Sequence, residues 1–235
     1  MKNIFTLNEL LWLIYIIVNY TFILIAYKKW GKVGILIFIP LSIVVANIQV
    51  NKLMTIFGVV TTMGNIAYGG IFLIEDILSE NYGKQYAKKV ITIGFATMIF
   101  MTIIMSIAIH VNVAPEDTAQ PHLVALFAPL YRLTFASLTA YGCSSLVDIY
   151  AYQAIRSLWP SFKNIWIRNN LSTILSQIVD NVIFTLVAFA GIYDFKILIS
   201  IMFSTYFLKV IISTLDTPFV YIAAWWKKEG KIEEF

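Results

Sequence analysis

The chain has 235 residues, of which 60% are hydrophobic and 13% are charged, and its mean hydropathy is +0.80. A soluble domain carries about 25% charged residues, so this composition excludes an ordinary soluble protein and indicates one integral membrane domain. The formal net charge of +4 comes from basic loops between apolar segments, so it does not require a nucleic-acid partner.

Seven apolar segments predict about seven transmembrane helices, because about 20 helical residues cross the hydrocarbon core of a bilayer. They cover residues 10–27, 33–50, 64–78, 90–109, 124–154, 170–190 and 195–225. The third segment is short and follows the interrupted apolar stretch 57–62, which predicts an irregular or re-entrant lead-in. The fifth and seventh are long, which indicates tilt or extension past the membrane surface. We therefore expect an all-α integral membrane protein.

Basic residues alternate along the chain. Three follow each of the first, third, fifth and seventh segments, and at most one follows each of the others. Those after the fifth segment are Arg156, Lys163 and Arg168. By the positive-inside rule the N-terminus lies outside and the C-terminus inside. The first segment has its lysines behind it, so we expect a retained anchor rather than a removable signal sequence.

Charged side chains also lie within the apolar segments, at Arg132, Asp148, Asp180, Lys209 and Asp216. Each such group costs roughly 2.5 to 3.5 kcal/mol at the centre of a membrane helix, and intramembrane charges usually mark solute or ion pathways. The simplest explanation is a polar region that handles a polar solute. The sequence therefore predicts a transporter.

The sixth segment carries a polar stripe. Its members are spaced four, three and four residues apart, which places them on one helical face: Asn169, Thr173, Ser176 and Asp180. Asn170, Gln177 and Asn181 lie beside the stripe. Asp180 is about 18 Å along the helix from Arg168, near the membrane midplane. We interpret Asp180 and its flanking amides as a solute or ion site, whereas the hydroxyls alone could equally join helices.

The last segment carries Lys209 and Asp216 on one face, followed by Pro218, which predicts a loosened helix at Asp216. Lys209 either neutralises Asp180 or Asp216 as a structural pair or contacts the solute directly.

Arg132 and Asp148 lie on the fifth segment, about 24 Å apart along it, so they cannot pair with each other. Arg132 could hold an anionic partner or cap an outer gate. Asp148 could contact solute or lie at the inner interface beside Arg156.

The motifs of known enzyme classes are missing from the sequence, which contains no nucleophile elbow, metal-binding helix motif or phosphate loop. We expect no cofactor, no metal and no enzyme activity. The alternative from another class is an intramembrane enzyme that uses Asp76, Asp148 and Asp180 as acids and bases. The acids Glu75, Asp76 and Glu80 could also be solvated charge at the inner rim.

An ordered set of motifs resembles the queuosine precursor transporter family, also called the vitamin uptake transporter family. The matching stretches are ANIQV at 46–50, GNIAYG at 64–69, DILSENYG at 76–83, RLTFASLTAY at 132–141, RNN at 168–170 and LDTPF at 215–219, with Asp148, Trp166, Ser172, Thr173, Ser176, Gln177, Asp180 and Lys209. Ser145 and Asn181 depart from the pattern of many relatives, so the particular compound that this chain carries stays open.

The resemblance implies an importer of 7-deazaguanines, such as preQ0, preQ1 or queuine, in the bacterial cytoplasmic (inner) membrane. It implies a single domain over 1–235, made of an additional N-terminal helix at 1–31, a six-helix core at 32–226 similar to vitamin-binding S-components, and a cytoplasmic tail at 227–235. A substrate-binding subunit that needs a separate ATPase module is the alternative. A homo-oligomer is also compatible with the sequence.

The chemistry of such a cargo suits this chain, because one carboxylate can accept both parallel N–H donors of a guanine-like edge. Asp180 is the first candidate and Asp76 the second. Amides could read the other ring atoms, and an aromatic side chain could stack on the base. The expected binding residues are Asn47, Gln49, Asn65, Tyr68, Phe72, Asp76, Arg132, Tyr141, Asp148, Asn170, Thr173, Gln177, Asp180, Lys209 and Asp216.

Overall fold

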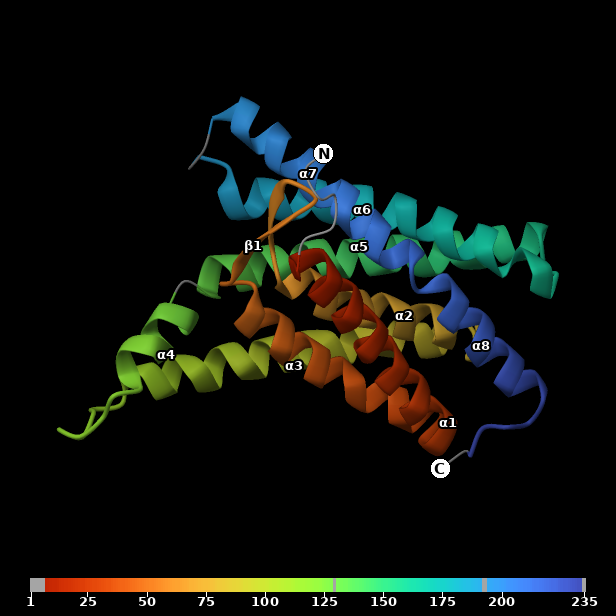
Figure 1. Ribbon diagram of the computed structural model, residues 1–235, viewed down its shortest axis with the longest axis horizontal. Coiled ribbons are helices and arrows are strands. Elements are labelled where there is room, and N and C mark those ends of the chain that lie inside the picture. Colours follow the sequence, from red (N-terminus) through yellow and green to blue (C-terminus); the bar gives the residue numbers. More distant parts are fainter. Residues whose placement is uncertain (1–6, 129, 192–193, 234–235) are drawn as a thin grey trace.

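Long helices run between the two ends of an elongated molecule (Figure 1) in the computed structural model, which describes residues 7–128, 130–191 and 194–233. The elements in chain order are α1 (Leu7–Gln49), β1 (Leu53–Ile56), β2 (Val59–Thr62), α2 (Gly64–Tyr82), α3 (Lys84–His110), α4 (Gln120–Phe127), α5 (Leu130–Leu158), the short 3-10 helix η1 (Phe162–Asn164), α6 (Ile165–Phe189), α7 (Phe195–Thr214) and α8 (Thr217–Lys228).

α1 is two arms that fold back on each other. The turn lies at Gly31, whose φ of 55° and ψ of −141° are readily adopted only by glycine. Gly34 follows closely, and a Cβ atom there would lie 2.2 Å from the carbonyl oxygen of Ala26. The Tyr15 hydroxyl donates to the Gln49 side-chain oxygen at 2.8 Å, although a straight helix would separate the two residues by about 51 Å. The arms correspond to the first two expected segments.

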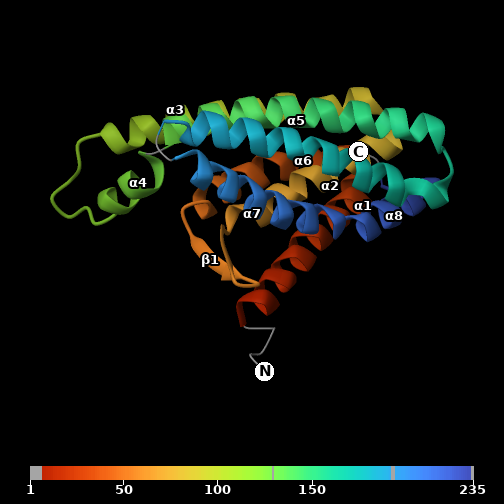
Figure 2. The ribbon, with the colours of Figure 1, turned by 90° about the horizontal axis from the view of Figure 1, so that it is seen from above.

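The expected irregular lead-in at 57–62 is instead part of a two-stranded antiparallel hairpin of β1 and β2. Its turn is Phe57-Gly58, where both φ angles are positive, as a two-residue hairpin turn requires. The strands are rich in β-branched residues, which favour extended backbone. The Phe57 backbone N–H donates to the Glu9 carboxylate at 2.8 Å. Figure 2 shows the hairpin and the first arm of α1 on the side away from α3 and α5.

The two longest expected segments are each broken. The fifth corresponds to α4 and α5, which are bent by 41° relative to each other. The seventh corresponds to α7 and α8, which meet at Leu215 and Asp216. Pro218 follows that break, so the predicted loosening at Asp216 is confirmed.

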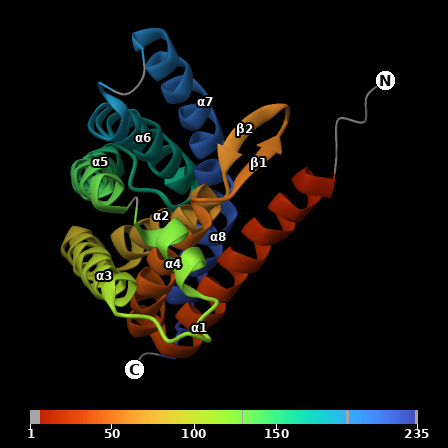
Figure 3. The same ribbon diagram turned by 90° about the vertical axis from the view of Figure 1, so that its left-hand side faces the viewer.

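α2 is the central helix and packs against α1, α3, α5, α7 and α8 (Figure 3). Its residues 69–79 are all buried, including the carboxylates of Glu75 and Asp76. The expectation that Glu75 and Asp76 are solvated charges at the inner rim is therefore wrong. Gly69 and Gly70 permit the close approach, because a Cβ at Gly69 would lie 2.6 Å from the Ile212 side chain.

Four helices in the described part of the chain are long and apolar enough to cross a membrane, or five if the bent pair α4 and α5 counts as one span. The protein is thus a helical, multi-pass membrane protein. The number of seven spans and the outside position of the N-terminus stay predictions.

The turn of α1, the end of α2, the start of α3 and the end of α8 lie at the end of the bundle that carries the C-terminus in Figure 1, and these segments are rich in basic residues. Contacts join the separate loops there. The Lys28 ammonium lies 5.1 Å from the Trp226 ring centroid, and that of Lys227 lies 4.4 Å from the Tyr82 ring centroid. We call this region the basic end and define it by Lys28, Lys29, Lys32, Lys84, Lys88, Lys89, Arg156, Lys227 and Lys231. The alternation of charge along the sequence is therefore also a separation in space.

Candidate functional site

An ion pair joins α6 to α7 inside the bundle. The Lys209 ammonium donates to the Asp180 carboxylate, and their side chains are 16% and 11% exposed. Ser144 of α5 donates to the other Asp180 oxygen at 3.4 Å. The Phe184 ring centroid lies 6.0 Å from the ammonium. Two charges of opposite sign thus lie at the meeting point of three helices, as the polar stripes indicate.

The stripes of α5 and α6 face each other. Ser176 of α6 donates to the Asp148 carboxylate at 3.0 Å, while Ser144 of α5 contacts Asp180. Each helix thus contributes one serine and one aspartate, four residues apart. Because α5 and α6 run in opposite directions along one shared face, each serine meets the aspartate of the other helix. Asp148 is 2% exposed and lies inside the bundle, not at its interface with water.

Asp216 lies at the break between α7 and α8 and is completely buried. The Asn169 amide donates to it at 2.7 Å and to the Thr217 hydroxyl at 3.1 Å. The Asn170 amide donates to the same hydroxyl at 3.0 Å. These contacts hold the first turns of α6 against the break and keep Asn170 near the break rather than beside Asp180.

Asp76 brings α2 into the same region. It is 1% exposed, and neither carboxylate oxygen has a hydrogen-bond partner in the described residues. Asp148 and Asp216 lie close enough for their negative charges to repel that of Asp76. The neighbouring Glu75 accepts a hydrogen bond from the Tyr141 hydroxyl at 3.4 Å. Three acids from α2, α5 and the α7–α8 break therefore come together.

Several buried polar atoms in the described part of the chain have no hydrogen-bond partner. They are Glu75 Oε2, Asp76 Oδ1 and Oδ2, Ser79 Oγ, Ser145 Oγ, Asn169 Oδ1, Gln177 Nε2 and Oε1, Asn181 Oδ1 and Asp216 Oδ2. Buried polar groups in proteins are nearly always hydrogen-bonded, to the protein or to something bound in it. This set is suited to holding a polar solute or water among α2, α5, α6 and the α7–α8 break.

Aromatic and amide groups from α1, α2 and α5 approach the same region. The Tyr68 hydroxyl interacts with the side chains of Asn47 and Ser137 and lies within electrostatic reach of Asp180. Phe72 and Tyr141 are 7% and 3% exposed. Thr173 is buried, and its hydroxyl donates to the Asn169 carbonyl in its own helix at 2.9 Å. Tyr68, Phe72 and Tyr141 stay the candidates for stacking on a planar ring.

Other expected residues lie elsewhere. Gln49 contacts Tyr15 between the arms of α1. Asn65 is half-buried at the start of α2. Arg132 is exposed and donates to the carbonyl oxygens of Val187 and Ala190 at 3.1 and 2.8 Å, at the end of α6. The structure therefore does not bring Gln49 and Arg132 to the region of Asp180.

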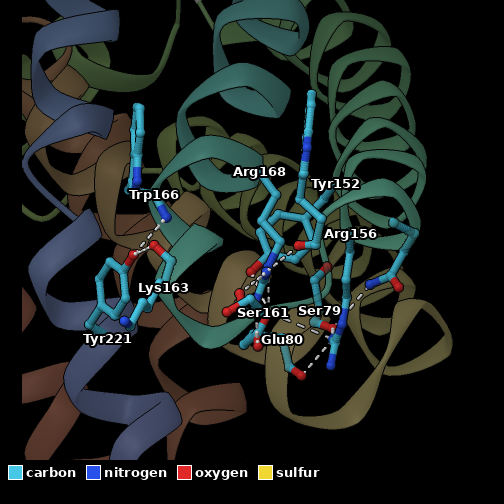
Figure 4. A network of polar contacts seen from close by, with 11 residues as sticks. Ser79, Glu80, Tyr152, Arg156, Ser161, Lys163, Trp166, Arg168 and Tyr221 are labelled. Carbon is cyan, nitrogen blue, oxygen red and sulfur yellow. Dashed lines mark hydrogen bonds and ion pairs between the residues drawn. The ribbon is translucent and has the colours of Figure 1, made fainter.

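Sequence reasoning missed the role of Arg168, which it assigned to a basic loop. Arg168 is completely buried, and its guanidinium donates to both oxygens of Glu80 at 2.9 and 2.7 Å (Figure 4). It also donates to the carbonyls of Trp159 and Ser161. Tyr152 donates to Glu80 at 2.8 Å. Arg168, Ser172 and Ser176 recur every four residues and so lie close to one helical face. This spacing is the signal that could have placed Arg168 inside the bundle.

Comparisons with known proteins agree with this arrangement. Residues 62–223 match the family described as "Putative vitamin uptake transporter". The chain is 38% identical over 216 residues to a probable queuosine precursor transporter of Bacillus subtilis, which covers 92% of this chain and 94% of that protein. It is 24% identical over 179 residues to the queuosine precursor transporter of Escherichia coli, with 69% and 78% covered. No solved structure matches the chain.

Proposed function

Because the chain belongs to the vitamin uptake transporter family, we propose that it carries queuosine precursors into the bacterial cell across the cytoplasmic (inner) membrane. Family membership makes the protein a membrane transporter of a small molecule and not an enzyme. The cargo that we propose is a 7-deazaguanine such as preQ0, preQ1 or queuine. This proposal extends to the present chain what the names of its relatives state for them.

The observation that carries the proposal is the Asp180–Lys209 ion pair together with the buried amide of Gln177, three residues before Asp180, which has no hydrogen-bond partner among the described residues. A transporter of a nucleobase needs groups that hydrogen-bond every polar edge of the base, because a wrong base then leaves some of them unpaired. Asp180 can accept the parallel N–H donors of a guanine-like edge. The buried amide of Gln177 offers one donor and one acceptor for the remaining ring atoms.

Lys209 has a second role in this mechanism. In the empty protein it neutralises Asp180, which would otherwise be an isolated buried charge. When the N–H groups of the base occupy Asp180, the ammonium becomes available to a carbonyl oxygen of the same base. The exchange keeps both charged groups hydrogen-bonded throughout binding, which suits a site that must load and unload repeatedly.

Transport then requires the site to open alternately to the two sides of the membrane. Carriers do this by rocking one group of helices against another around a central site. The described contacts suit such a motion, because Asp180 lies on α6 and Lys209 on α7, next to the break at Asp216.

The test is uptake of labelled 7-deazaguanine by cells that cannot make it and that express the full chain. Asp180→Asn should abolish uptake while the protein still reaches the membrane. The matched control is Asp194→Asn, which makes the same chemical change at an exposed position between α6 and α7. Unchanged uptake by Asp180→Asn would refute the assignment. Uptake in a host without any energising ATPase module distinguishes a self-sufficient carrier from a binding subunit.

A further inference from the structure

The acids of α2, α5 and the α7–α8 break form one buried group. We call it the acid cluster and define it by four residues: Glu75, Asp76, Asp148 and Asp216. All four are at most 2% exposed. Ser176 of α6 donates to Asp148 at 3.0 Å. Asn169, on the same face of α6, donates to Asp216 at 2.7 Å. Asp76 lies within electrostatic reach of both of these acids, and Glu75 lies within reach of Asp148.

The basic groups around the acid cluster are committed elsewhere. Arg168 and Arg156 contact Glu80, and Lys209 pairs with Asp180. The lysines of α3 and Lys227 of α8 lie over tyrosine rings at the basic end. The other titratable groups that face the cluster are hydroxyls or a carboxylate: Tyr20 of α1, Glu80 of α2, and Tyr141 and Tyr152 of α5. The described residues therefore give the four acids no positive partner.

Protons on these acids remove the difficulty. An ionised carboxylate inside a protein is costly unless an opposite charge compensates it. Ionised together, the four would also repel one another. A proton removes the charge of a carboxyl group and turns one of its oxygens from an acceptor into a donor. The cluster therefore favours a state in which most of its acids are protonated.

The amide of Asn169 is a separate indication of a proton. Asn169 is 1% exposed, and its nitrogen is committed to Asp216 Oδ1 and to the Thr217 hydroxyl. Its carbonyl oxygen can only accept, and it has no partner in the described part of the chain. Asp216 Oδ2, on the other side of the same pair, has none either. One proton on Asp216 Oδ2 supplies the donor that these two acceptors lack, and a protonated carboxyl and an amide can then pair through two parallel hydrogen bonds.

The cluster also spans a boundary between two groups of helices. α5 and α6 pack side by side, whereas α5 approaches α2 over a short stretch (Figures 1 and 2). Asp76 lies on α2 and Asp148 on α5, so a rocking motion of the α5–α6 pair relative to α2 would part these acids and admit water to them. Water reduces the cost of ionisation. The motion that moves the cargo would therefore also let the acids release protons.

From these observations we propose that the acid cluster carries protons together with the cargo, which makes the protein a proton-coupled importer. A carboxylate of the cluster takes a proton from water on the outer side, and the same carboxyl releases it to water on the inner side. The cargo site is near, because the serine contacts of Asp180 and of Asp148 lie about 6 Å apart, one helical turn along α5 and α6. The inference rests on the proposed function and adds its energy source.

The experiment uses the purified full chain in lipid vesicles, with labelled 7-cyano-7-deazaguanine as an uncharged probe. The medium is made one pH unit more acidic than the interior, and the membrane voltage is held at zero. One proton per cargo then supports accumulation of the label up to about tenfold, and a protonophore should abolish it. Vesicles without protein, and exchange of label at equal pH, are the controls.

Each other result has its own meaning. Carrier-mediated exchange that only equalises the two concentrations, with or without the pH gradient, would overturn the coupling and leave the proposed function intact. Accumulation driven by a Na⁺ gradient at equal pH would overturn it as well. If the protein catalyses no exchange, the proposed function fails and the inference fails with it.

Variants locate the proton. Asp76→Asn, Asp148→Asn and Asp216→Asn each replace a carboxyl by an amide that cannot take up or release a proton in this way. In vesicles that still exchange label, each should reduce accumulation to a ratio of about one. Asp194→Asn makes the same change at an exposed position and should keep the accumulation of the unmodified protein. Full accumulation in all three cluster variants would show that these acids do not carry the proton.

A measurement on the unmodified protein does not depend on how well a variant transports. The infrared C=O stretch of protonated carboxyl groups is separate from the bands of carboxylates and shifts on deuteration. We expect this band at neutral pH, because acids in water are ionised there and those of the cluster are not. Its absence at neutral pH would overturn the inference, even where a variant shows no exchange.

Discussion

Arg168 of α6 and Glu80 of α2 face each other through two parallel hydrogen bonds, although residue 168 is entirely shielded from solvent. Nη1 of the guanidinium donates to the carbonyls of Trp159 and Ser161, so four of its five N–H donors have acceptors in these contacts. The ion pair therefore connects the end of α2 with the turn between α5 and α6. A buried ion pair of this kind contributes little net stability but is costly to break from one side only.

Removing the carboxylate of Glu80 should show how much it costs to break this buried ion pair. Glu80→Gln is expected to lower the free energy of unfolding by about 3–5 kcal/mol, because it leaves the buried charge of Arg168 uncompensated. Thermal unfolding of the purified protein in detergent measures the change. Glu233→Gln is the matched control, since its pair with Lys29 is 56% and 63% exposed and should contribute less than about 1 kcal/mol. Similar small changes in both variants would contradict a structural role for the buried pair.

Gln177 should show opposite effects on stability and on function. Neither polar atom of its buried amide has a partner among the described residues, so Gln177→Leu should leave the empty protein as stable as before or raise its melting temperature. The same change should reduce uptake about tenfold or more, because the cargo loses two hydrogen bonds. Gln153→Leu is the control, since the Gln153 amide donates to the Ser79 carbonyl at 3.0 Å and its loss should destabilise. Lower stability together with unchanged uptake in Gln177→Leu would assign that amide to packing.

Arg132 should affect stability rather than transport. Its guanidinium donates to carbonyls at the end of α6, where a positive charge also favours the helix dipole. Arg132→Met is expected to lower the free energy of unfolding by about 1 kcal/mol and to leave the KM of uptake unchanged. Unfolding and uptake are measured on the same preparation of cells and membranes. An increase in KM without loss of stability would instead place this residue in the solute pathway.

The turn between the arms of α1 should tolerate no added side chain at Gly34. Gly34→Ala would place its Cβ 2.2 Å from the Ala26 carbonyl oxygen, which is backbone and cannot move aside cheaply. The expected loss is about 1–3 kcal/mol, seen as a lower midpoint of thermal unfolding. Val33→Ala changes the exposed neighbouring position and should alter the midpoint little. An unchanged midpoint for Gly34→Ala would show that the arms can separate without cost.

Periodicity predicted the parts of the site that lie on one helix. The four stripe residues of α6 are all buried, as their spacing indicates, and Pro218 correctly marked the break at Asp216. Such features depend only on residues close together in the sequence. They can therefore be predicted from one amino-acid sequence.

Most features that depend on partners far away in the sequence were not predicted, although the pairing of Lys209 with Asp180 was one of the stated alternatives. The pairing of Arg168 with Glu80 joins residues 88 positions apart, and an arginine beside a basic loop reads equally well as solvated charge. The hairpin of β1 and β2 was visible in principle, because its strands are β-branched around Phe57-Gly58. The hairpin was not predicted because its residues are apolar, as those of a membrane segment are.

The interruption at Asp216 also separates two halves of the last segment that pack against different neighbours. α7 lies chiefly against α6, whereas α8 lies against α2 and α1. The Tyr20 hydroxyl donates to the Ile212 carbonyl at 3.0 Å and anchors the chain just before the interruption. In one continuous helix, a change in the tilt of α7 would also move its other end, at the basic end. Two helices joined at an anchored hinge allow one to change its tilt while the other keeps its position.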